Sequence, residues 1–207
     1  EEYGLGELNP ERVRDLLANR PERPPPPSHL PPRPPMLCPG CPHRAVFAVL
    51  KKLKLFVTGD IGCYTLGTLP PLSALDTCLC MGAGIGQSEG MRRVLLPAAA
   101  RKVVAVIGDS TFIHSGITPL IHSGITGLVD LVYNGNGGVV IILDNLTTAM
   151  TGLQGHPGTG TGLHGRPARQ VRLCEICRGA GVNRVKIIDS YDLPALEAYL
   201  RESLPLD

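Results

Sequence analysis

Two polar segments of the chain place oxygen-bearing side chains directly after apolar runs, and this pattern favours a cation site. Asp109 follows the run at 103–107, and Asn145 comes shortly after the run at 139–143. Continuous apolar runs rich in β-branched residues predict strands buried on both faces, as in a parallel sheet. Because open α/β sheets bind ligands outside the carboxyl ends of their strands, we expect Asp109 and Asn145 to lie side by side. A carboxylate, an amide oxygen and nearby backbone carbonyls form an incomplete oxygen shell, which suits Mg²⁺ and leaves positions for phosphates.

The cysteines form a second candidate group. Cys38 and Cys41 are a Cys-x-x-Cys pair at the start of a predicted helix, and Cys63 follows a short predicted strand. The pair by itself fits zinc, a redox dithiol or an iron–sulfur cluster. A thioredoxin-like dithiol is less favoured, because it belongs after the first strand of a βαβ unit and this pair precedes the first strand. For the other four cysteines we expect buried free thiols; they are Cys78, Cys80, Cys174 and Cys177.

The elements that must position these groups alternate between strand and helix along the chain. The predicted strands are 55–57, 77–81, 103–107, 139–143 and 184–188. The predicted helices are 10–18, 42–54, 86–95, one that ends near Tyr133, 171–179 and 193–203, and a glycine-rich loop occupies 152–165. This alternation predicts an α/β fold with a doubly wound, mostly parallel sheet and helices on both faces.

The N-terminal part differs in composition from the rest, and it predicts three regions. Residues 1–20 resemble the end of a preceding region, with a short helix capped at Asn9. Residues 21–35 read PERPPPPSHLPPRPP, which predicts an extended, proline-rich linker, although a ligand for an SH3-type domain stays an alternative. We expect one domain at 36–207, truncated at its C-terminus because a further strand would normally follow.

Composition excludes several classes of function. The formal net charge is +2 and aromatic residues make up 4% of the 207 residues, so nothing favours a nucleic-acid partner. No stretch approaches the roughly 20 apolar residues that a membrane-spanning helix needs. Seven cysteines without a secretory signal favour a reducing, cytoplasmic location.

The motifs together resemble a known family. The two strand–loop segments resemble the GDG…N motif of thiamine-diphosphate enzymes. LDNLTTAMTG, LCPGCPHRAVF, GDIGCYTLG and DTCLCMGAGIG resemble the large (alpha) subunit of indolepyruvate ferredoxin oxidoreductases, in the 2-oxoacid:ferredoxin oxidoreductase superfamily. The resemblance implies a thiamine-diphosphate-binding fold, with Mg²⁺ held by the side chains of Asp109 and Asn145 and the carbonyl of Thr147. The cofactor-binding residues that it implies are His43, Gly62, Cys63, Gly82, Gly108, Asp109, Ser110, Thr111, Asn145, Thr147, Thr148, Ala149, Met150 and Thr151.

Some of these residues have a plainer explanation. A histidine at a helix start, such as His43, can simply bond to the backbone. Gly62, Gly82 and Gly84 can serve a tight crossing between strand and helix.

The resemblance also implies a redox activity that this chain would only partly carry. Cys38, Cys41 and Cys63 would ligate a 4Fe-4S cluster, whose fourth cysteine lies beyond the end of this chain. The reaction would be oxidative decarboxylation of an arylpyruvate such as indolepyruvate, with coenzyme A taking the acyl group and ferredoxin the electrons. The activating carboxylate would come from a separate pyrimidine-binding domain, and a second subunit would complete the enzyme. We assign no catalytic residue here and expect this chain alone to be inactive. The alternatives are a subunit of a non-oxidative thiamine-dependent 2-oxoacid decarboxylase and a non-catalytic cofactor-binding fragment.

A tandem repeat interrupts the motif. Residues 113–120 read IHSGITPL and residues 121–128 read IHSGITGL. In one continuous helix, identical side chains eight residues apart would face directions about 80° apart. Pro119 also disfavours a helix in the first copy. We therefore expect the helix to begin near the second copy and residues 113–120 to form a looped-out insertion.

Overall fold

The computed structural model describes residues 9–21, 34–114, 124–135 and 137–204. The chain divides into two compact units, Glu1–Pro34 and Pro35–Asp207. In the first unit, helix α1 (Pro10–Leu17) begins as the sequence predicts, since the Asn9 side chain accepts a hydrogen bond from the Arg12 N–H at 2.8 Å. Most of the predicted proline-rich linker lies outside the described residues, and so its conformation stays a prediction.

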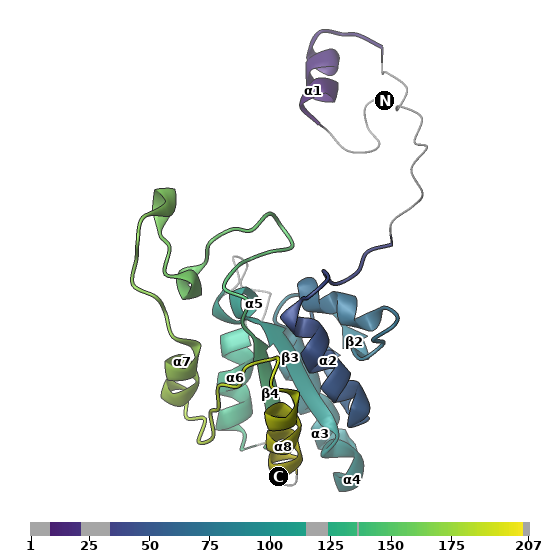
Figure 1. Ribbon diagram of the computed structural model, residues 1–207, viewed down its shortest axis with the longest axis vertical. Helices are drawn as coiled ribbons and strands as arrows, with labels where there is room; N and C mark the ends of the chain where they lie inside the picture. Colours follow the sequence, from purple (N-terminus) through teal and green to yellow (C-terminus); the bar gives the residue numbers. More distant parts are fainter. Residues whose placement is uncertain (1–8, 22–33, 115–123, 136, 205–207) are drawn as a thin grey trace. The chain divides into compact units, whose positions relative to one another are not determined.

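The second unit is built on four parallel strands in the order β2-β1-β3-β4 (Figure 1). The strands are β1 (Phe56–Gly59), β2 (Thr77–Cys78), β3 (Val103–Gly108) and β4 (Val139–Leu143). The chain passes from β1 to β2 on one side and then returns to place β3 on the other side of β1. This reversal of strand order creates a switch point between β1 and β3, where open α/β sheets bind ligands at the carboxyl ends of the strands.

The central strand β3 is buried along its whole length and supplies both faces of the core. Val104 and Val106 belong to one apolar cluster, with helices α2 (Pro42–Lys52) and α8 (Leu193–Ser203). Ala105 and Ile107 belong to the other, with α3 (Ala83–Val94), α6 (Gly124–Tyr133) and α7 (Leu173–Gly179). Because successive strand residues point to opposite faces, the alternation shows helices on both sides of the sheet. The prediction of a doubly wound α/β fold is confirmed.

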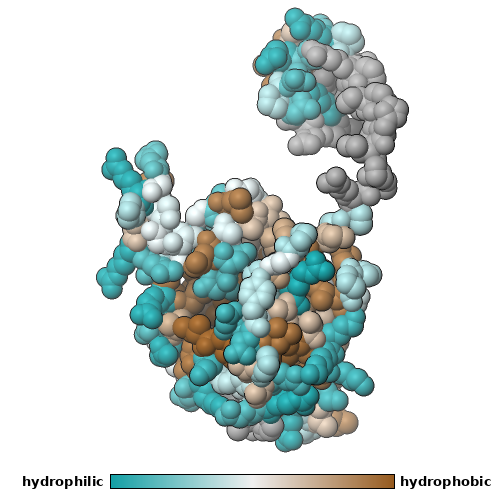
Figure 2. Space-filling model, viewed as in Figure 1, coloured by the Kyte–Doolittle hydropathy of each residue, from teal (hydrophilic) through white to brown (hydrophobic). Residues whose placement is uncertain are grey.

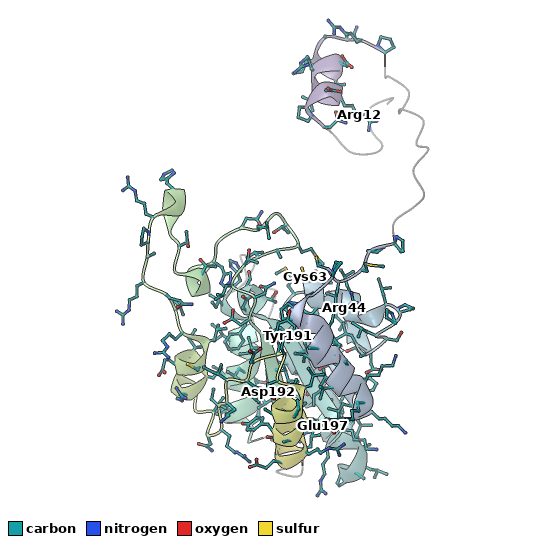
Figure 3. The ribbon with its side chains drawn as sticks, viewed as in Figure 1. Arg12, Arg44, Cys63, Tyr191, Asp192 and Glu197 are labelled. Carbon is teal, nitrogen blue, oxygen red and sulfur yellow. The ribbon has the colours of Figure 1, made fainter. Side chains whose placement is uncertain are left out.

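Helix α8 ties the C-terminal segment to α2 and to the turn of the Cys-x-x-Cys pair. Glu197 pairs with Lys52 at 2.7 Å, and Asp192 caps α8 through the Ala195 N–H at 3.0 Å (Figure 3). The Tyr191 hydroxyl donates to the carbonyl of Gly40, between the two cysteines. The position of this turn therefore depends on residues about 150 positions away in the sequence.

The remaining elements are short and lie between the main helices and strands. They are α4 (Pro97–Ala100), α5 (Asp109–Ile113), and the 3₁₀ turns η1 (Cys63–Thr68), η2 (Pro157–Thr159) and η3 (Leu163–Gly165). Within the described ranges, no helix combines the length and apolar character that a bilayer crossing requires.

Two strand predictions need correction. Residues 184–188 form no strand, and the predicted strand at 77–81 is limited to Thr77–Cys78. Val185 and Ile188 are partly buried against the two different clusters, whereas Ile187 is 74% exposed, so the apolar spacing indicates burial only in part. Burial of side chains does not require a hydrogen-bonded ladder, however, and the pattern cannot distinguish the two. Within the described residues, β4 is consequently the edge of the sheet.

Only the two ends of the repeat, Ile113–His114 and Gly124–Leu128, lie among the described residues. Helix α5 ends at Ile113, His114 is extended, and α6 begins at Gly124 inside the second copy, so one unbroken helix from Ile113 to Tyr133 is excluded. Gly127, the counterpart of Pro119, packs so closely on α3 that an added Cβ would lie 3.2 Å from Ile85. The second copy thus suits this helix contact, whereas a proline there would not. The expected loop-out of the first copy falls mainly on residues 115–120, outside the described residues, and it stays a prediction.

Candidate cofactor-binding site

The carboxylate of Asp109 lies at the end of β3, beside the end of β4. The strand register pairs Gly108 with Leu143, which brings the residues after both strands together. Asp109 is 3% exposed, and its Oδ2 accepts the Asn145 N–H at 3.2 Å while its Oδ1 accepts the Ser110 N–H at 2.7 Å. The prediction that Asp109 and Asn145 lie side by side is confirmed. Figure 1 shows α5, which begins at Asp109, at this end of β3.

The loop after β4 folds back onto α5. The Asn145 Oδ1 accepts the Thr147 N–H at 3.3 Å, which is a local turn that asparagine commonly forms. The hydroxyls of Ser110 and Thr148 lie 2.7 Å apart, and Thr148 also pairs through its backbone with Gln154. The predicted residues on both strand ends therefore meet at one place.

Three predicted residues lie further along this loop. Ala149, Met150 and Thr151 occupy a turn that is closed by the Gly152 N–H bonding to the Ala149 carbonyl at 3.2 Å. Met150 is 49% exposed, and the Thr151 hydroxyl bonds to Gln154 at 2.6 Å. In the described structure these three residues make no hydrogen bond with α5.

The charges at this site fit a bound cation. Burial, and then a hydrogen bond with the Asp109 carboxylate, raise the pKa of Asp144 above its usual value. Among the described residues, His156 is the one basic side chain paired with Asp109. Two neighbouring carboxylates without a lysine or arginine repel each other, and a bound cation would relieve this repulsion.

The donor set also fits magnesium better than a transition metal. Within the described part of the chain, no three His, Cys, Asp or Glu side chains are grouped so that they could hold a metal ion. The shell expected for Mg²⁺ uses a different set, namely one carboxylate, one amide oxygen and a backbone carbonyl. Asp109 and Asn145 bring a carboxylate and an amide oxygen to this edge of the sheet, and their use with the Thr147 carbonyl as Mg²⁺ ligands stays a prediction.

Two buried histidines lie near Asp109, and only one of them is among the predicted residues. Burial lowers the pKa of His43 from its ordinary value, and the charge of Asp109 acts in the opposite direction, so the two groups are neighbours. His156 is 4% exposed, and its Nε2 lies 3.2 Å from the Asp109 Oδ2. Nothing in the local sequence distinguishes His156 from the exposed His164 in the same glycine-rich loop. The sequence analysis therefore missed His156.

The three predicted cluster cysteines lie at the same edge of the sheet. Cys41 and Cys63 pack against the same core cluster, and Figure 3 shows Cys63 at the edge where β1 and β3 end. Burial first, and then the charges of Cys41, Cys38 and Asp109, raise the pKa of the Cys63 thiol. The thiols thus influence one another electrostatically, although they are not grouped as a formed metal site.

The other cysteines are also free thiols. Cys174 and Cys177 are buried on α7, and Cys177 belongs to the cluster on the opposite face of the sheet. Cys80 is exposed and Cys78 is half-buried, so the expectation that all four would be buried is wrong for these two. Strand β2 ends at Cys78, and the following residues turn outwards before α3 begins.

A buried pair that the sequence analysis also missed holds the loop after β1. The Tyr64 hydroxyl donates to the Asp60 Oδ1, and the Asp60 Oδ2 accepts the Gly84 N–H at 3.2 Å. Asp60 is fully buried, and this burial raises its pKa to about 6. Burial, followed by the charge of Asp60, likewise raises the pKa of Tyr64. The pair joins the end of β1 to η1 and to the start of α3.

The Tyr64 ring also explains two glycines of the motifs. A Cβ on Gly62 would lie 2.3 Å from the Tyr64 Cε1, and a Cβ on Gly108 would lie 2.7 Å from it. Gly82 has φ 84°, a left-handed conformation that favours glycine, immediately before α3. These contacts support the plainer explanation of the glycines, and a role in cofactor contact stays a prediction.

Comparison with known proteins agrees with this geometry. The family described as "Thiamine pyrophosphate enzyme, C-terminal TPP binding domain" matches residues 60–206. The chain is 45% identical over 182 residues to the indolepyruvate oxidoreductase subunit IorA of Archaeoglobus fulgidus, covering 86% of this chain and 27% of that protein. It is 37% identical over 191 residues to the IorA of Pyrococcus horikoshii (86% and 28%) and 40% identical over 184 residues to that of Methanothermobacter thermautotrophicus (84% and 28%). The chain thus spans less than a third of the length of these relatives. It belongs to the thiamine pyrophosphate enzyme family as a C-terminal, cofactor-binding domain homologous to part of IorA.

Proposed function

We propose that this chain forms the diphosphate-binding half of an active site that oxidatively decarboxylates arylpyruvates such as indolepyruvate. The products would be aryl-acetyl-coenzyme A, carbon dioxide and reduced ferredoxin. The observation that carries the proposal is the meeting of Asp109, Asn145 and Thr148 at the carboxyl ends of β3 and β4. The substrate class is supported by the relatives that match this chain, whose name is indolepyruvate oxidoreductase.

In this proposal the residues at the strand ends hold Mg²⁺ and the diphosphate. The side chains of Asp109 and Asn145 and the carbonyl of Thr147 bind the cation, which neutralises the carboxylate in its buried position. The bound cofactor supplies the carbanion chemistry, and the protein supplies binding, orientation and electrostatics. The hydroxyls of Ser110 and Thr148 stand beside Asp109 and would donate to the diphosphate oxygens.

The residues for the diphosphate and the thiamine ring surround this centre. We assign to this lining His43, Gly62, Cys63, Gly82, Gly108, Thr111, Ala149, Met150 and Thr151. Thr111 supports the assignment, because its hydroxyl donates to the Ile61 carbonyl at 3.4 Å and so joins the loops after β1 and β3.

Cys38, Cys41 and Cys63 ligate the 4Fe-4S cluster in this proposal. Their support is that burial, and then the charges of Cys41 and Cys38, raise the pKa of the Cys63 thiol, so the three thiols lie within electrostatic reach of one another. The fourth ligand would come from outside this chain. Without the cluster, the site would serve a non-oxidative 2-oxoacid decarboxylase, and iron content decides between the two activities.

A separate pyrimidine-binding domain and a second subunit would complete the enzyme, with ferredoxin as the electron acceptor. Large apolar side chains are exposed in the loop after β4, including Leu146 at 53% and Leu153 at 72%. Figure 2 shows apolar residues at the surface of the upper edge of the domain, where the strands end. Exposed apolar surface of this kind is typical of a face that another domain covers.

The test is thiamine diphosphate binding by the full-length protein with and without Mg²⁺, measured by calorimetry and thermal shift. Asp109→Asn keeps the shape of the side chain but removes the charge that offsets the cation. At a cofactor concentration of 100 times its dissociation constant, the loss of binding removes about 2.7 kcal/mol of apparent stability. The control is Asp130→Asn, which changes an exposed carboxylate on α6. A cofactor-induced shift that Asp109→Asn leaves intact would overturn the assignment.

A further inference from the structure

His156 reaches the site from a segment that is distant in sequence. It lies 47 residues after Asp109, between the loop that follows β4 and the turn η2. Its side chain is 0% exposed and that of Asp109 is 4% exposed, so solvent does not separate the two groups. The Nε2 of His156 and the Oδ2 of Asp109 are 3.2 Å apart.

The hydrogen bonds of His156 assign the position of its ring proton. The Gly158 N–H lies 3.1 Å from the Nδ1, and a backbone N–H can only donate. The Nδ1 must therefore carry a lone pair, and the proton of the neutral ring is on the Nε2. The Nε2–H consequently donates to the Asp109 Oδ2.

Packing fixes the ring in this orientation. A Cβ on Gly158 would lie 2.8 Å from the His156 Cε1 and 3.2 Å from the Ile113 Cδ1. Only a glycine allows the backbone of η2 to approach both the ring and the end of α5 this closely. The imidazole is thus held between η2 and the helix that begins at Asp109.

Counting acceptor positions on Asp109 shows what this bond does. Each carboxylate oxygen offers about two lone pairs. The Oδ2 accepts both the Asn145 N–H and the His156 Nε2–H, so its two positions are taken. The Oδ1 accepts the Ser110 N–H, and its one remaining position is open either to the protonated Asp144 carboxyl group or to a cation that replaces this contact. That position is the one through which Asp109 can bind a cation.

We propose that His156 is a positioning residue for the metal-binding carboxylate: its neutral Nε2–H saturates the Oδ2 of Asp109 and directs the Oδ1 towards Mg²⁺. This inference rests on the proposed function. Ligating carboxylates are commonly oriented by hydrogen bonds from neighbouring groups, whose loss weakens metal binding by about 10- to 100-fold. His156 is such a neighbour, and it touches neither the cofactor's reacting atoms nor, in this proposal, the metal.

Two substitutions of His156 test separately the hydrogen bond made by its Nδ1 and the one made by its Nε2. The amide of asparagine occupies the place of the Nδ1, so His156→Asn keeps the cap on Gly158 but cannot reach Asp109. The amide of glutamine extends to the place of the Nε2, so His156→Gln keeps a donor for Asp109 but loses the cap. His164→Asn is the matched control, since His164 is exposed in the same loop with φ 58°, where asparagine is tolerated.

The measurement is the Mg²⁺ concentration that gives half-maximal binding of thiamine diphosphate to the full-length protein, followed by calorimetry. We expect His156→Asn to raise it about 10- to 100-fold, whereas His156→Gln and His164→Asn leave it near the parent value. If His156 only stabilised the loop by capping η2, the order of the two His156 variants would be reversed. The reversed order, or an asparagine variant that matches the control, would overturn the inference.

Two further outcomes are also decisive. If His156→Asn does not fold, the glutamine variant decides, since a loss of about tenfold or more in its Mg²⁺ affinity contradicts the inference. A parent protein that binds thiamine diphosphate without Mg²⁺, or not at all, would instead refute the proposed function itself.

Discussion

The buried carboxyl group of Asp60 makes the stability of the domain depend on pH in a definite direction. Burial raises its pKa from 3.8 to about 6, so between these values the folded state binds a proton that the unfolded state has released. The free energy of unfolding must therefore fall as the pH rises through this window. The stabilisation that the protonated Asp60 gives to the folded state is complete below pH 3.8 and lost above about pH 6. Since one pKa unit corresponds to about 1.4 kcal/mol, the whole effect is about 3 kcal/mol.

Asp60→Asn isolates this contribution. The asparagine oxygen can accept the Gly84 N–H, and its amide group can donate to the Tyr64 hydroxyl, so both contacts of the carboxyl group are kept without a titratable proton. We expect the variant to gain stability relative to the parent by most of about 3 kcal/mol between pH 4 and pH 7.5.

The assay is urea denaturation of the cofactor-free protein at several values of pH, followed by circular dichroism. Asp130→Asn, which alters an exposed carboxylate on α6, is the control and should follow the parent at every pH. A difference between Asp60→Asn and the parent that is the same at pH 4 and pH 7.5 would refute the reasoning, whatever its size.

Three further predictions follow from the packing, the cysteines and the repeat. Gly108→Ala should destabilise the domain by about 1–3 kcal/mol in the same denaturation assay, because the added methyl group meets the Tyr64 ring, whereas Gly90→Ala, which has open space in α3, should be neutral or stabilising. Cys63→Ser should lower the iron content of anaerobically purified full-length protein, while the exposed Cys80→Ser should not, and equal iron in both variants would contradict the cluster assignment. Deletion of residues 113–120 should keep thiamine diphosphate binding, because Ile121 and His122 then take the places of Ile113 and His114; a deletion variant that no longer folds would refute the looped-out insertion.

Local sequence patterns were sufficient for the central elements. The strand at 139–143 and the helix at 193–203 have the predicted bounds, and β3 extends only one residue beyond its prediction. A continuous apolar run and a capping aspartate such as Asp192 are signals that a few neighbouring residues carry. Where the same kind of pattern was wrong, at 184–188, Val185 and Ile188 are partly buried as the pattern indicates, but Ile187 is exposed and the backbone does not pair as a strand.

The sequence alone also determined the centre of the site. Residues that follow neighbouring parallel strands must meet at the same edge of the sheet, and so Asp109 and Asn145 could be brought together without a structure. Cys63 follows a strand in the same way, whereas Cys38 and Cys41 precede the first strand and were grouped with it through the family resemblance. For Asp109, Asn145 and Cys63 the relevant information is the residue type and its position after a strand.

Only the tertiary structure decided which other groups contact Asp109 and which residues hold the loops around it. His156 comes from a glycine-rich loop whose path no periodicity predicts, and its partner is 47 residues away. Asp60 and Tyr64 are close in sequence, but their burial depends on Gly84 of α3 and on the space left by Gly108 of β3. Desolvation and hydrogen-bond partners arise from the packing of distant segments, so the raised pKa of Asp60 and the proton position on His156 exist only in the folded chain.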